Sequence, residues 1–354
     1  MVAGGDIDKD LILAEGQYPV IANALTGDGI VGYYDKEYRV NAPAVTVTGR
    51  GDVGHAKARL VNFTPVVRLL SVKSEHDVFF LENVINTLKI VIESTGVPQL
   101  TVPQLAKYEV AFPRQLDEEE HIGAFFKQLD HLITLHQRKY DKLTKVKKAM
   151  LEKMFPENGS PYPEIRFKGF TDAWEQHKLG ELADIVGGGT PSTSNFEYWD
   201  GDIDWYAPAE IADQIFVSSS ERKITQQGYD NSSAKLLPPG TVLFTSRAGI
   251  GKTAILARKG CTNQGFQSIV PHKNELDTYF IFSRTEELKR YGELVGAGST
   301  FVEVSGKQMA AMDLMLPSTI QEQQMIGVFF KHLDNLITLH QRESTYFTGG
   351  FYAE

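Results

Sequence analysis

The sequence predicts an α+β protein built as an internal repeat, with two mixed α/β domains that are separated by two long helices. The first observation is a repeated segment. Ile122–Arg138, IGAFFKQLDHLITLHQR, returns 204 positions later as Ile326–Arg342, IGVFFKHLDNLITLHQR, with 14 of 17 residues identical. The second is a weaker repeat, in which Val45–Ala56 aligns with Val242–Thr253 and shares Val, Thr, Arg and Gly at an offset of 197. Together they indicate two related units, each followed by the same helix.

The repeated segments have the apolar spacing of helices that pack on another helix. In both copies apolar residues recur at steps of four and three, at Ile122, Phe126, Leu129 and Ile133 and at Ile326, Phe330, Leu333 and Ile337. Two core helices of an ordinary domain would show the same spacing. Such helices have no need to keep Lys127 and Lys331, or Asp130 and Asp334, as well.

Turn-forming and helix-breaking residues along the chain predict the domain boundaries. Short β-type runs and a helix over 78–94 fill a first domain at 1–114, and one continuous helix follows at 115–156. A proline-rich linker at 157–164 leads to a second domain at 165–317 and a shorter helix at 318–345. The first domain has no equivalent of Trp174 or of Lys178–Glu181, so we expect its opening strand and helix to be missing.

Composition restricts the class of protein. Hydrophobic residues make up 42% of the 354 residues, which is typical of a folded globular protein. No 18-residue apolar run or signal-type N-terminus is present, which predicts a cytoplasmic protein with no membrane partner. The lone Cys261 excludes an internal disulfide and a cysteine-based zinc site, and we expect an inert core thiol.

Charge is the main argument against a nucleic-acid-binding protein. The formal net charge is −9, whereas DNA-binding domains are usually basic. The segment Arg138–Lys153 nevertheless carries +5 and the rest of the chain −14. A solvated helix face is one interpretation of this basic segment, and a local DNA-binding or partner-binding patch is the other.

The repeated turn motif, T-x-R-x-x-x-G, carries an arginine in each unit. Gly249–Thr253 resembles the end of a phosphate-binding loop, but that loop requires glycine where Ser246 stands, and the first copy has His55 in place of Lys252. A strand followed by a glycine-rich turn is the favoured alternative. Arg50 and Arg247 would then reach guanine edges or phosphates, or each would pair with a carboxylate beside the turn.

Other polar segments leave their roles open. Asn263 and Gln264 carry amides that could read adenine or cap a turn. The polar segment from Thr190 to Asn195, near Trp199 and Trp205, could contact a ligand or close over a core. No metalloprotease, serine-hydrolase or amino-methyltransferase motif occurs, which favours a binding protein over an enzyme. His136 and His340 recur on the helix seam, where packing explains them better than metal binding does.

The chain resembles the specificity subunit of Type I restriction-modification systems. The matching phrases are the paired helices, PEIRFKGFTDAWEQHKLGEL at Pro163–Leu182, GGGTPS at Gly187–Ser192, TNQGF at Thr262–Phe266 and AGSTF at Ala297–Phe301. The resemblance implies two target-recognition domains, each of which reads half of a bipartite double-stranded DNA target. It also implies that the two helices run antiparallel as a coiled coil and dock two methyltransferase subunits.

The resemblance further implies a non-catalytic subunit that binds no cofactor. S-adenosylmethionine would bind the methyltransferase subunits, which methylate adenine. ATP and magnesium would bind the restriction subunit. The alternative is a truncated or silent specificity cassette that acts as a helical adaptor without productive DNA recognition. The candidate DNA-contacting residues are Arg50, Gly54, His55, Ser246, Arg247, Gly251, Lys252, Thr253, Asn263 and Gln264. The seam residues named above are the candidates for helix packing and partner docking.

Overall fold

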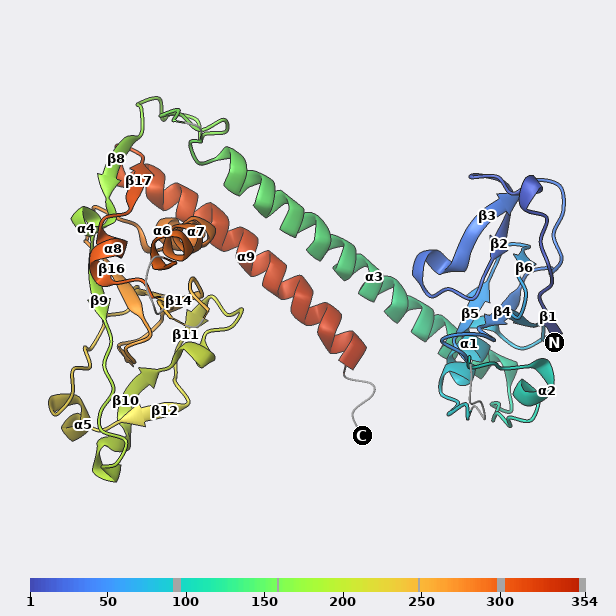
Figure 1. Ribbon diagram of the computed structural model, residues 1–354. Coiled ribbons are helices and arrows are strands. Elements are labelled where there is room, and N and C mark those ends of the chain that lie inside the picture. Colours follow the sequence, from blue (N-terminus) through green and yellow to red (C-terminus); the bar gives the residue numbers. More distant parts are fainter. Residues whose placement is uncertain (92–96, 158, 248, 298–302, 350–354) are drawn as a thin grey trace. The chain divides into compact units, whose positions relative to one another are not determined.

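The computed structural model describes residues 1–91, 97–157, 159–247, 249–297 and 303–349 (Figure 1). The chain forms two compact units: unit 1 holds Met1–His136 with Ser344–Glu354, and unit 2 holds Gln137–Glu343. The dividing line falls inside the long helix α3, Leu116–Lys153, and not at one of its ends. Each unit therefore contains one α/β domain and one half of α3.

Unit 1 contains two small sheets, two short α-helices and two short 3-10 helices before α3. Its strands are β1 (Val2–Ala3), β2 (Tyr18–Ile21), β3 (Ile30–Tyr34), β4 (Ala44–Val47), β5 (Ala56–Arg59), β6 (Thr64–Pro65) and β7 (Leu70–Val72). Its helices are η1 (Lys9–Leu11), η2 (Thr26–Gly29), α1 (Val78–Asn86) and α2 (Val102–Leu105). The sheets have the orders β1-β7-β4-β5 and β3-β2-β6. All four residues of the central strand β4 are buried, and α1 packs on them to form the core.

Unit 2 repeats this plan with additions. Its strands are β8 (Glu175–Lys178), β9 (Ala183–Gly187), β10 (Trp199–Tyr206), β11 (Phe216–Val217), β12 (Arg222–Ile224), β13 (Val242–Phe244), β14 (Thr253–Leu256), β15 (Cys261–Thr262), β16 (Gln267–Pro271) and β17 (Asp313–Leu316). Its helices are α4 (Leu179–Leu182), η3 (Phe196–Tyr198), η4 (Pro208–Glu210), α5 (Gln226–Asp230), α6 (Thr278–Ser283), α7 (Thr285–Gly296), α8 (Gly306–Ala310) and α9 (Ile320–Gly349).

The two units share one topology, which confirms the internal repeat. The order β9-β16-β13-β14 corresponds to β1-β7-β4-β5, and β12-β10-β15 corresponds to β3-β2-β6. Even the parallel pairs match, because β10 pairs in parallel with β15 and β2 with β6. Unit 2 adds β11 at the β14 edge. Unit 1 covers the same edge with the Asn86 amide, which bonds the backbone N–H and C=O of Ala56 at 2.8 and 3.1 Å.

One helix of unit 1 is shorter than the sequence predicts. The helix expected over 78–94 ends at Asn86, and residues 92–96 lie outside the described part of the chain. Asp77 begins this helix, because its carboxylate accepts hydrogen bonds from the N–H groups of Phe79 (3.0 Å) and Phe80 (2.8 Å).

The first half of α3 packs on the α/β domain of unit 1 at a glycine. A Cβ atom on Gly123 would overlap the Asp77 carboxylate and lie 2.9 Å from the Phe80 backbone nitrogen. The helix therefore approaches the N-cap of α1 more closely than any other residue type would permit. On either side of this contact, the buried Glu119 bonds His76 at 3.0 Å and the Lys127 ammonium lies 4.4 Å from the Phe79 ring centroid.

In unit 2 the helix α9 packs on its domain in the same way. A Cβ atom on Gly327 would lie 2.5 Å from Asp277 Oδ1 and 3.1 Å from the Phe280 nitrogen, and Asp277 caps α6 as Asp77 caps α1. One turn earlier, Gln323 accepts a hydrogen bond from the Asp277 N–H and donates one to Glu275 O, both at 3.0 Å. The close sequence match of the helices therefore includes residues that bind each domain to its own helix.

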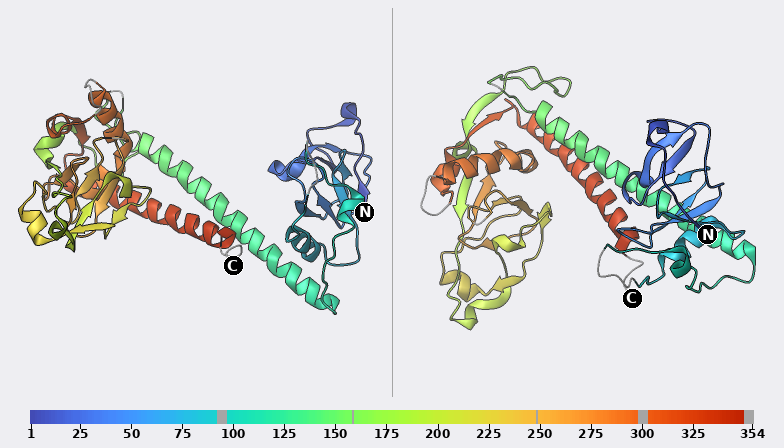
Figure 2. Two further views of the ribbon diagram at one scale, coloured as in Figure 1. Left: turned by 60° about the horizontal axis from the view of Figure 1, so that its bottom comes forward. Right: turned by 45° about the vertical axis from the view of Figure 1, so that its right-hand side comes forward.

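The second half of α3 lies antiparallel to α9 within unit 2 (Figure 2). Lys147 Nζ pairs with Asp334 Oδ1 at 2.5 Å, while Phe155, just beyond the end of α3, stacks on the earlier Phe330 with ring centroids 5.9 Å apart. The buried Asp334 also accepts a hydrogen bond from Tyr279 Oη at 2.7 Å. This carboxylate therefore joins α3, α9 and the domain.

Most seam residues of α9 are buried in the core of unit 2. Ile326, Phe330 and Leu333 belong to its main apolar cluster, and Ile337 is half-buried. In α3 the corresponding residues Ile122, Phe126, Leu129 and Ile133 are all half-buried. The helix α9 continues to Gly349, beyond the end expected near residue 345, and is shorter than α3, at 30 residues against 38.

Candidate nucleic-acid interface

The β4–β5 turn of unit 1 is held by one threonine and one glycine. Thr48 Oγ1 donates to Asp52 O at 2.5 Å and accepts from the His55 N–H at 3.0 Å. The Gly54 N–H donates to Thr48 O at 2.8 Å, and Gly54 has a φ of +91°, which favours glycine. Arg50 and His55 are exposed on this turn.

The β13–β14 turn of unit 2 has the same hydrogen bonds. Thr245 Oγ1 donates to Gly249 O at 2.7 Å and accepts from the Lys252 N–H at 2.9 Å, and the Gly251 N–H donates to Thr245 O at 3.0 Å. Gly251 has a φ of +95°. The turn joins two antiparallel strands, whereas a phosphate-binding loop leads into a helix. The strand-and-turn interpretation of the repeated motif is therefore confirmed.

A glycine loop lies against the loop that follows β15 in unit 2 and against the loop that follows β6 in unit 1. A Cβ atom on Gly188 would overlap the carbonyl oxygens of Thr262 and Asn263, and one on Gly4 would overlap that of Val66. Val2 pairs with Ser71 as Val186 pairs with Ser268, so Gly4 is the counterpart of Gly188. The first domain therefore has the glycine loop of the second, although strands and helices equivalent to β8 and α4 are absent from its described residues.

The third loop of unit 2 carries the predicted amides. Asn263 Oδ1 accepts the Gly265 N–H at 2.7 Å and so caps its own turn. The exposed Gln264 accepts a hydrogen bond from Thr190 Oγ1 at 2.5 Å, and the Ser246 N–H donates to Gly265 O at 2.8 Å. These bonds bring the glycine loop, the β13–β14 turn and the amide loop together at one edge of the five-stranded sheet.

The structure separates the predicted site residues into exposed and buried ones. Lys252 and Gln264 are exposed, and Arg247 is exposed but pairs with Glu303 at 2.7 Å. Ser246 and Thr253 are buried, at 0% and 8% exposure, so neither side chain lies on the surface of the turn. In a β hairpin alternate residues face inward, and Thr253 turns to Thr285, 2.8 Å away, at the start of α7.

The polar segment before β10 closes over a core. Trp199 Nε1 donates to Ser192 O at 3.1 Å and Trp205 Nε1 donates to Gly189 O at 2.8 Å, and both rings are buried. Arg222 stacks over Trp199 at 3.6 Å. The core-closing interpretation of this segment is therefore confirmed.

Ionisable groups in unit 2 serve mainly to hold the fold. Cys261 is fully buried, and burial raises the pKa of its thiol to about 11, as expected for an inert core thiol. Burial acts to raise the pKa of Asp204, but the Ser220 N–H and Lys223, at 3.1 Å, outweigh it, so this pKa is lowered. No described helix has the length and apolar composition needed to cross a membrane.

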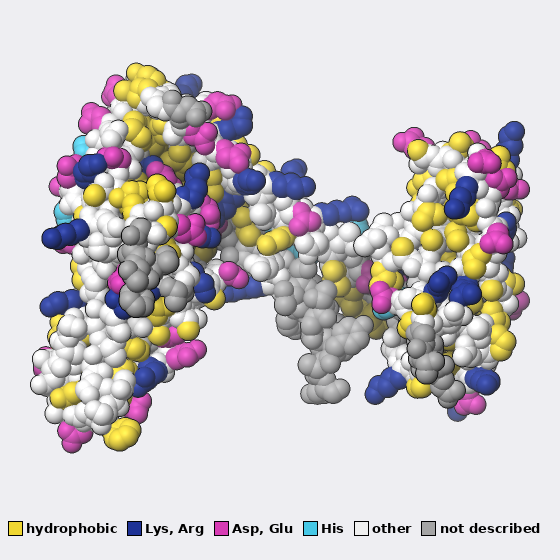
Figure 3. Space-filling model, viewed as in Figure 1, with side chains coloured by type: hydrophobic (Ala, Val, Ile, Leu, Met, Phe, Trp, Pro, Cys, Tyr) yellow, Lys and Arg dark blue, Asp and Glu magenta, His cyan; other side chains and the backbone are white. Residues whose placement is uncertain are grey.

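The helices carry a basic surface and a repeated pair of exposed leucines. Several Lys and Arg side chains lie over α3 in the view of Figure 3. Lys139, Lys142 and Lys145 of this helix are exposed. Leu132 and Leu135 on α3 are 39% and 36% exposed, and their counterparts Leu336 and Leu339 on α9 are 44% and 49% exposed.

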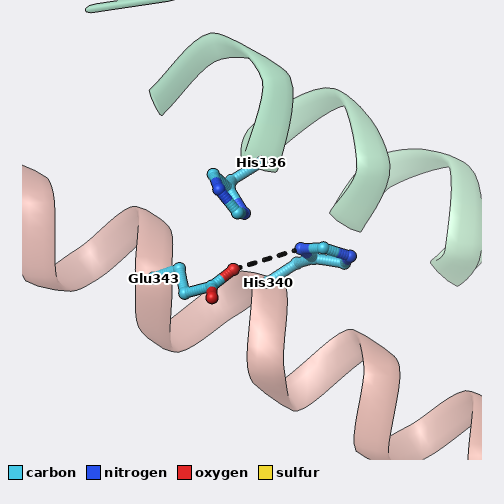
Figure 4. Close-up of side chains that lie close together, drawn as sticks. All are labelled: His136, His340 and Glu343. Carbon is cyan, nitrogen blue, oxygen red and sulfur yellow. Dashed lines mark ion pairs between the residues drawn. The ribbon is translucent and has the colours of Figure 1, made fainter. Parts of the chain in front are cut away.

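The two histidines of the helix seam, His136 and His340, belong to different units of the chain. His340 pairs with Glu343 on the same helix at 3.4 Å (Figure 4). His136, also drawn there, belongs to unit 1, and no site is assigned to the three residues together.

The fold and its loops define a class of duplicated protein in which each α/β domain presents a three-loop edge and packs on a long helix. The family model of the Type I restriction modification DNA specificity domain matches residues 2–145 and 171–345. The chain belongs to this family.

Among curated relatives, the Type I restriction enzyme MjaIX specificity subunit of Methanocaldococcus jannaschii is 35% identical over 174 residues, covering 48% of this chain and 40% of the relative. The EcoR124I/EcoR124II specificity subunit of Escherichia coli is 28% identical over 184 residues, covering 49% and 44%. The chain thus spans less than half the length of these relatives.

The fold also matches solved structures. The crystal structure of a Type I restriction-modification S subunit from M. genitalium aligns with a TM-score of 0.67 at 14% identity, covering 98% of this chain and 90% of that one. At this identity the match supports the fold alone.

Proposed function

We propose that this chain is a DNA-recognition subunit of a Type I restriction-modification complex, acting in the cytoplasm. Each unit contacts one half of a bipartite duplex target through its three-loop edge. The observation that carries the proposal is that the same backbone framework, with its threonine and glycine fixed, is built twice while the exposed side chains differ. Both units present an arginine, Arg50 and Arg247, and the exposed side chain that differs on the turn is His55 in unit 1 and Lys252 in unit 2. A constant scaffold with variable loops is typical of recognition domains.

Partner docking is the second part of the proposal. Ile326, Phe330 and Leu333 are occupied within unit 2, so the exposed leucines Leu336 and Leu339 are better suited to contact a methyltransferase subunit. Leu132 and Leu135 would serve a second copy of that subunit. The methyltransferase subunits would bind S-adenosylmethionine and catalyse methylation. A restriction subunit would bind ATP and magnesium.

The test is selection of duplexes from a randomised DNA library by the chain reconstituted with methyltransferase subunits. We expect enrichment of two short half-sites separated by a constant gap. A bidentate arginine–base pair contributes about 1–3 kcal/mol of discrimination, so Arg50→Ala should relax one base position in one half-site and Arg247→Ala one in the other. Arg247 must first leave Glu303, so Glu303→Gln should strengthen binding.

Two results would count against this proposal. Enrichment of no sequence by an assembled complex would support the helical-adaptor alternative. Loss of assembly in a Leu336→Ser, Leu339→Ser variant of normal thermal stability would support the docking surface, whereas unchanged assembly would exclude it.

A further inference from the structure

Arg68 occupies an unusual position in unit 1. It follows β6 in the loop that corresponds to Asn263–Gly265 of unit 2, because Thr64–Pro65 pairs with β2 as Cys261–Thr262 pairs with β10. Arg68 itself stands at the position of Gly265. Its φ is +70°, in the left-handed region that non-glycine residues seldom adopt.

The Arg68 loop is fixed against the turn that carries Arg50. The Asn23 side chain bridges them, since its amide donates to Val67 O at 3.0 Å and its carbonyl accepts the Gly49 N–H at 2.8 Å. A Cβ atom on Gly49 would overlap the carbonyl oxygen of Arg68, so the two loops are in backbone contact. Asn23 therefore preorganises two arginine-bearing loops at one corner.

Neither guanidinium has a partner within the described part of the chain. Among the residues that the structure describes, the side chains of Arg50 and Arg68 have no hydrogen bond or ion pair, although other arginines do. Arg39 donates to Asp6 O at 2.6 Å, Arg59 to Thr46 at 2.9 Å, and Arg166 to Glu322 at 2.7 Å. An uncommon backbone conformation at an arginine with no internal partner points to a ligand outside the chain.

We propose that Arg68, together with Arg50, contacts the DNA half-site of unit 1. This inference rests on the proposed function. The ligand chemistry is a pair of hydrogen-bond acceptors matched by the planar guanidinium, either guanine O6 and N7 or phosphate oxygens. The corresponding loop of unit 2 carries Gln264, whose carboxamide matches one donor and one acceptor, as on adenine, so the two units would read different bases from one scaffold.

The experiment compares Arg68→Gly, Arg68→Lys and, as the control, Arg114→Ala in the reconstituted complex. Arg68→Gly installs the residue of the counterpart loop and removes the left-handed strain, so we expect its thermal midpoint not to fall. We expect its affinity for the selected duplex to fall roughly 5- to 150-fold, with the base preference lost in one half-site only. Arg114 is an exposed arginine outside the three loops, and its substitution should leave affinity unchanged.

Arg68→Lys separates the two sources of acceptors. Lowered affinity with a lost base preference identifies a guanine contact, and full affinity with full preference identifies a phosphate contact through charge alone. Wild-type affinity and preference in Arg68→Gly would overturn the inference while leaving the proposed function intact. A thermal midpoint lowered in parallel with binding would assign Arg68 a structural role and also overturn it. If the wild-type complex selects no sequence, the proposed function fails and this inference fails with it.

Discussion

Gly123 gives the sharpest test of how a domain is fixed to its helix. In an exposed helix, Gly→Ala stabilises by about 0.5–1 kcal/mol. At Gly123 the new methyl group would overlap the Asp77 carboxylate and crowd the Phe80 nitrogen at 2.9 Å. Overpacking costs about 1–3 kcal/mol, and displacement of the α1 N-cap costs about 1 kcal/mol more. We therefore expect Gly123→Ala to destabilise unit 1 by about 1–3 kcal/mol overall.

A double-mutant cycle identifies the source of that loss. Asp77→Ala alone should cost about 1 kcal/mol, because the α1 cap is removed. In the double variant the alanine at 123 occupies space left by the carboxylate, so its stability should be close to that of Asp77→Ala alone. Urea unfolding of the three variants measures both quantities. A neutral or stabilising Gly123→Ala, or strictly additive effects, would refute the reasoning.

Four further predictions concern unit 2. Cys261 should resist a thiol reagent at pH 8 in the native protein and react as one thiol after denaturation, because its pKa is raised to about 11 by burial; rapid native labelling would contradict this. Asp204→Asn should lower the free energy of unfolding by about 1.5–3 kcal/mol at pH 7. Because the folded pKa of Asp204 is lowered, the wild-type advantage should be complete above the ordinary value of 3.8 and decline as the pH falls through the folded pKa, as followed by thermal midpoints. Phe330→Ala removes a fully buried ring and should cost about 3–5 kcal/mol in urea unfolding, where a loss under 1 kcal/mol would mean that the site is not core. Thr245→Val should cost about 1–3 kcal/mol by leaving the Lys252 N–H without its acceptor, with Thr48→Val as the matched change in unit 1.

The sequence predicted the features that depend on local pattern or on self-comparison. The helix repeat and the T-x-R-x-x-x-G turns were accessible, because a duplicated sequence can be aligned with itself, and the family was accessible through the resemblance of several sequence phrases. The seam residues Ile326, Phe330 and Leu333 were found from spacing alone, since helical periodicity specifies which face is buried.

Site residues were predicted less well, because their exposure depends on what packs against the turn. Ser246 and Thr253 are indistinguishable in sequence from exposed turn residues, and only the packing of Thr253 on Thr285 shows that it is buried. Arg68 gave no signal, since its loop was recognisable only after β6 and β15 had been matched through their strand partners.

By itself the sequence determined that the protein is a tandem of two domain-and-helix units, because periodicity and self-similarity are local properties of a chain. Only the tertiary structure decided why the two helices are so alike. Gly123 and Gly327 face the capping carboxylates Asp77 and Asp277, which lie 46 and 50 positions earlier in the chain. A contact of that sequence separation leaves no periodic pattern, so its requirement for glycine becomes visible only when the domain and its helix are seen packed together.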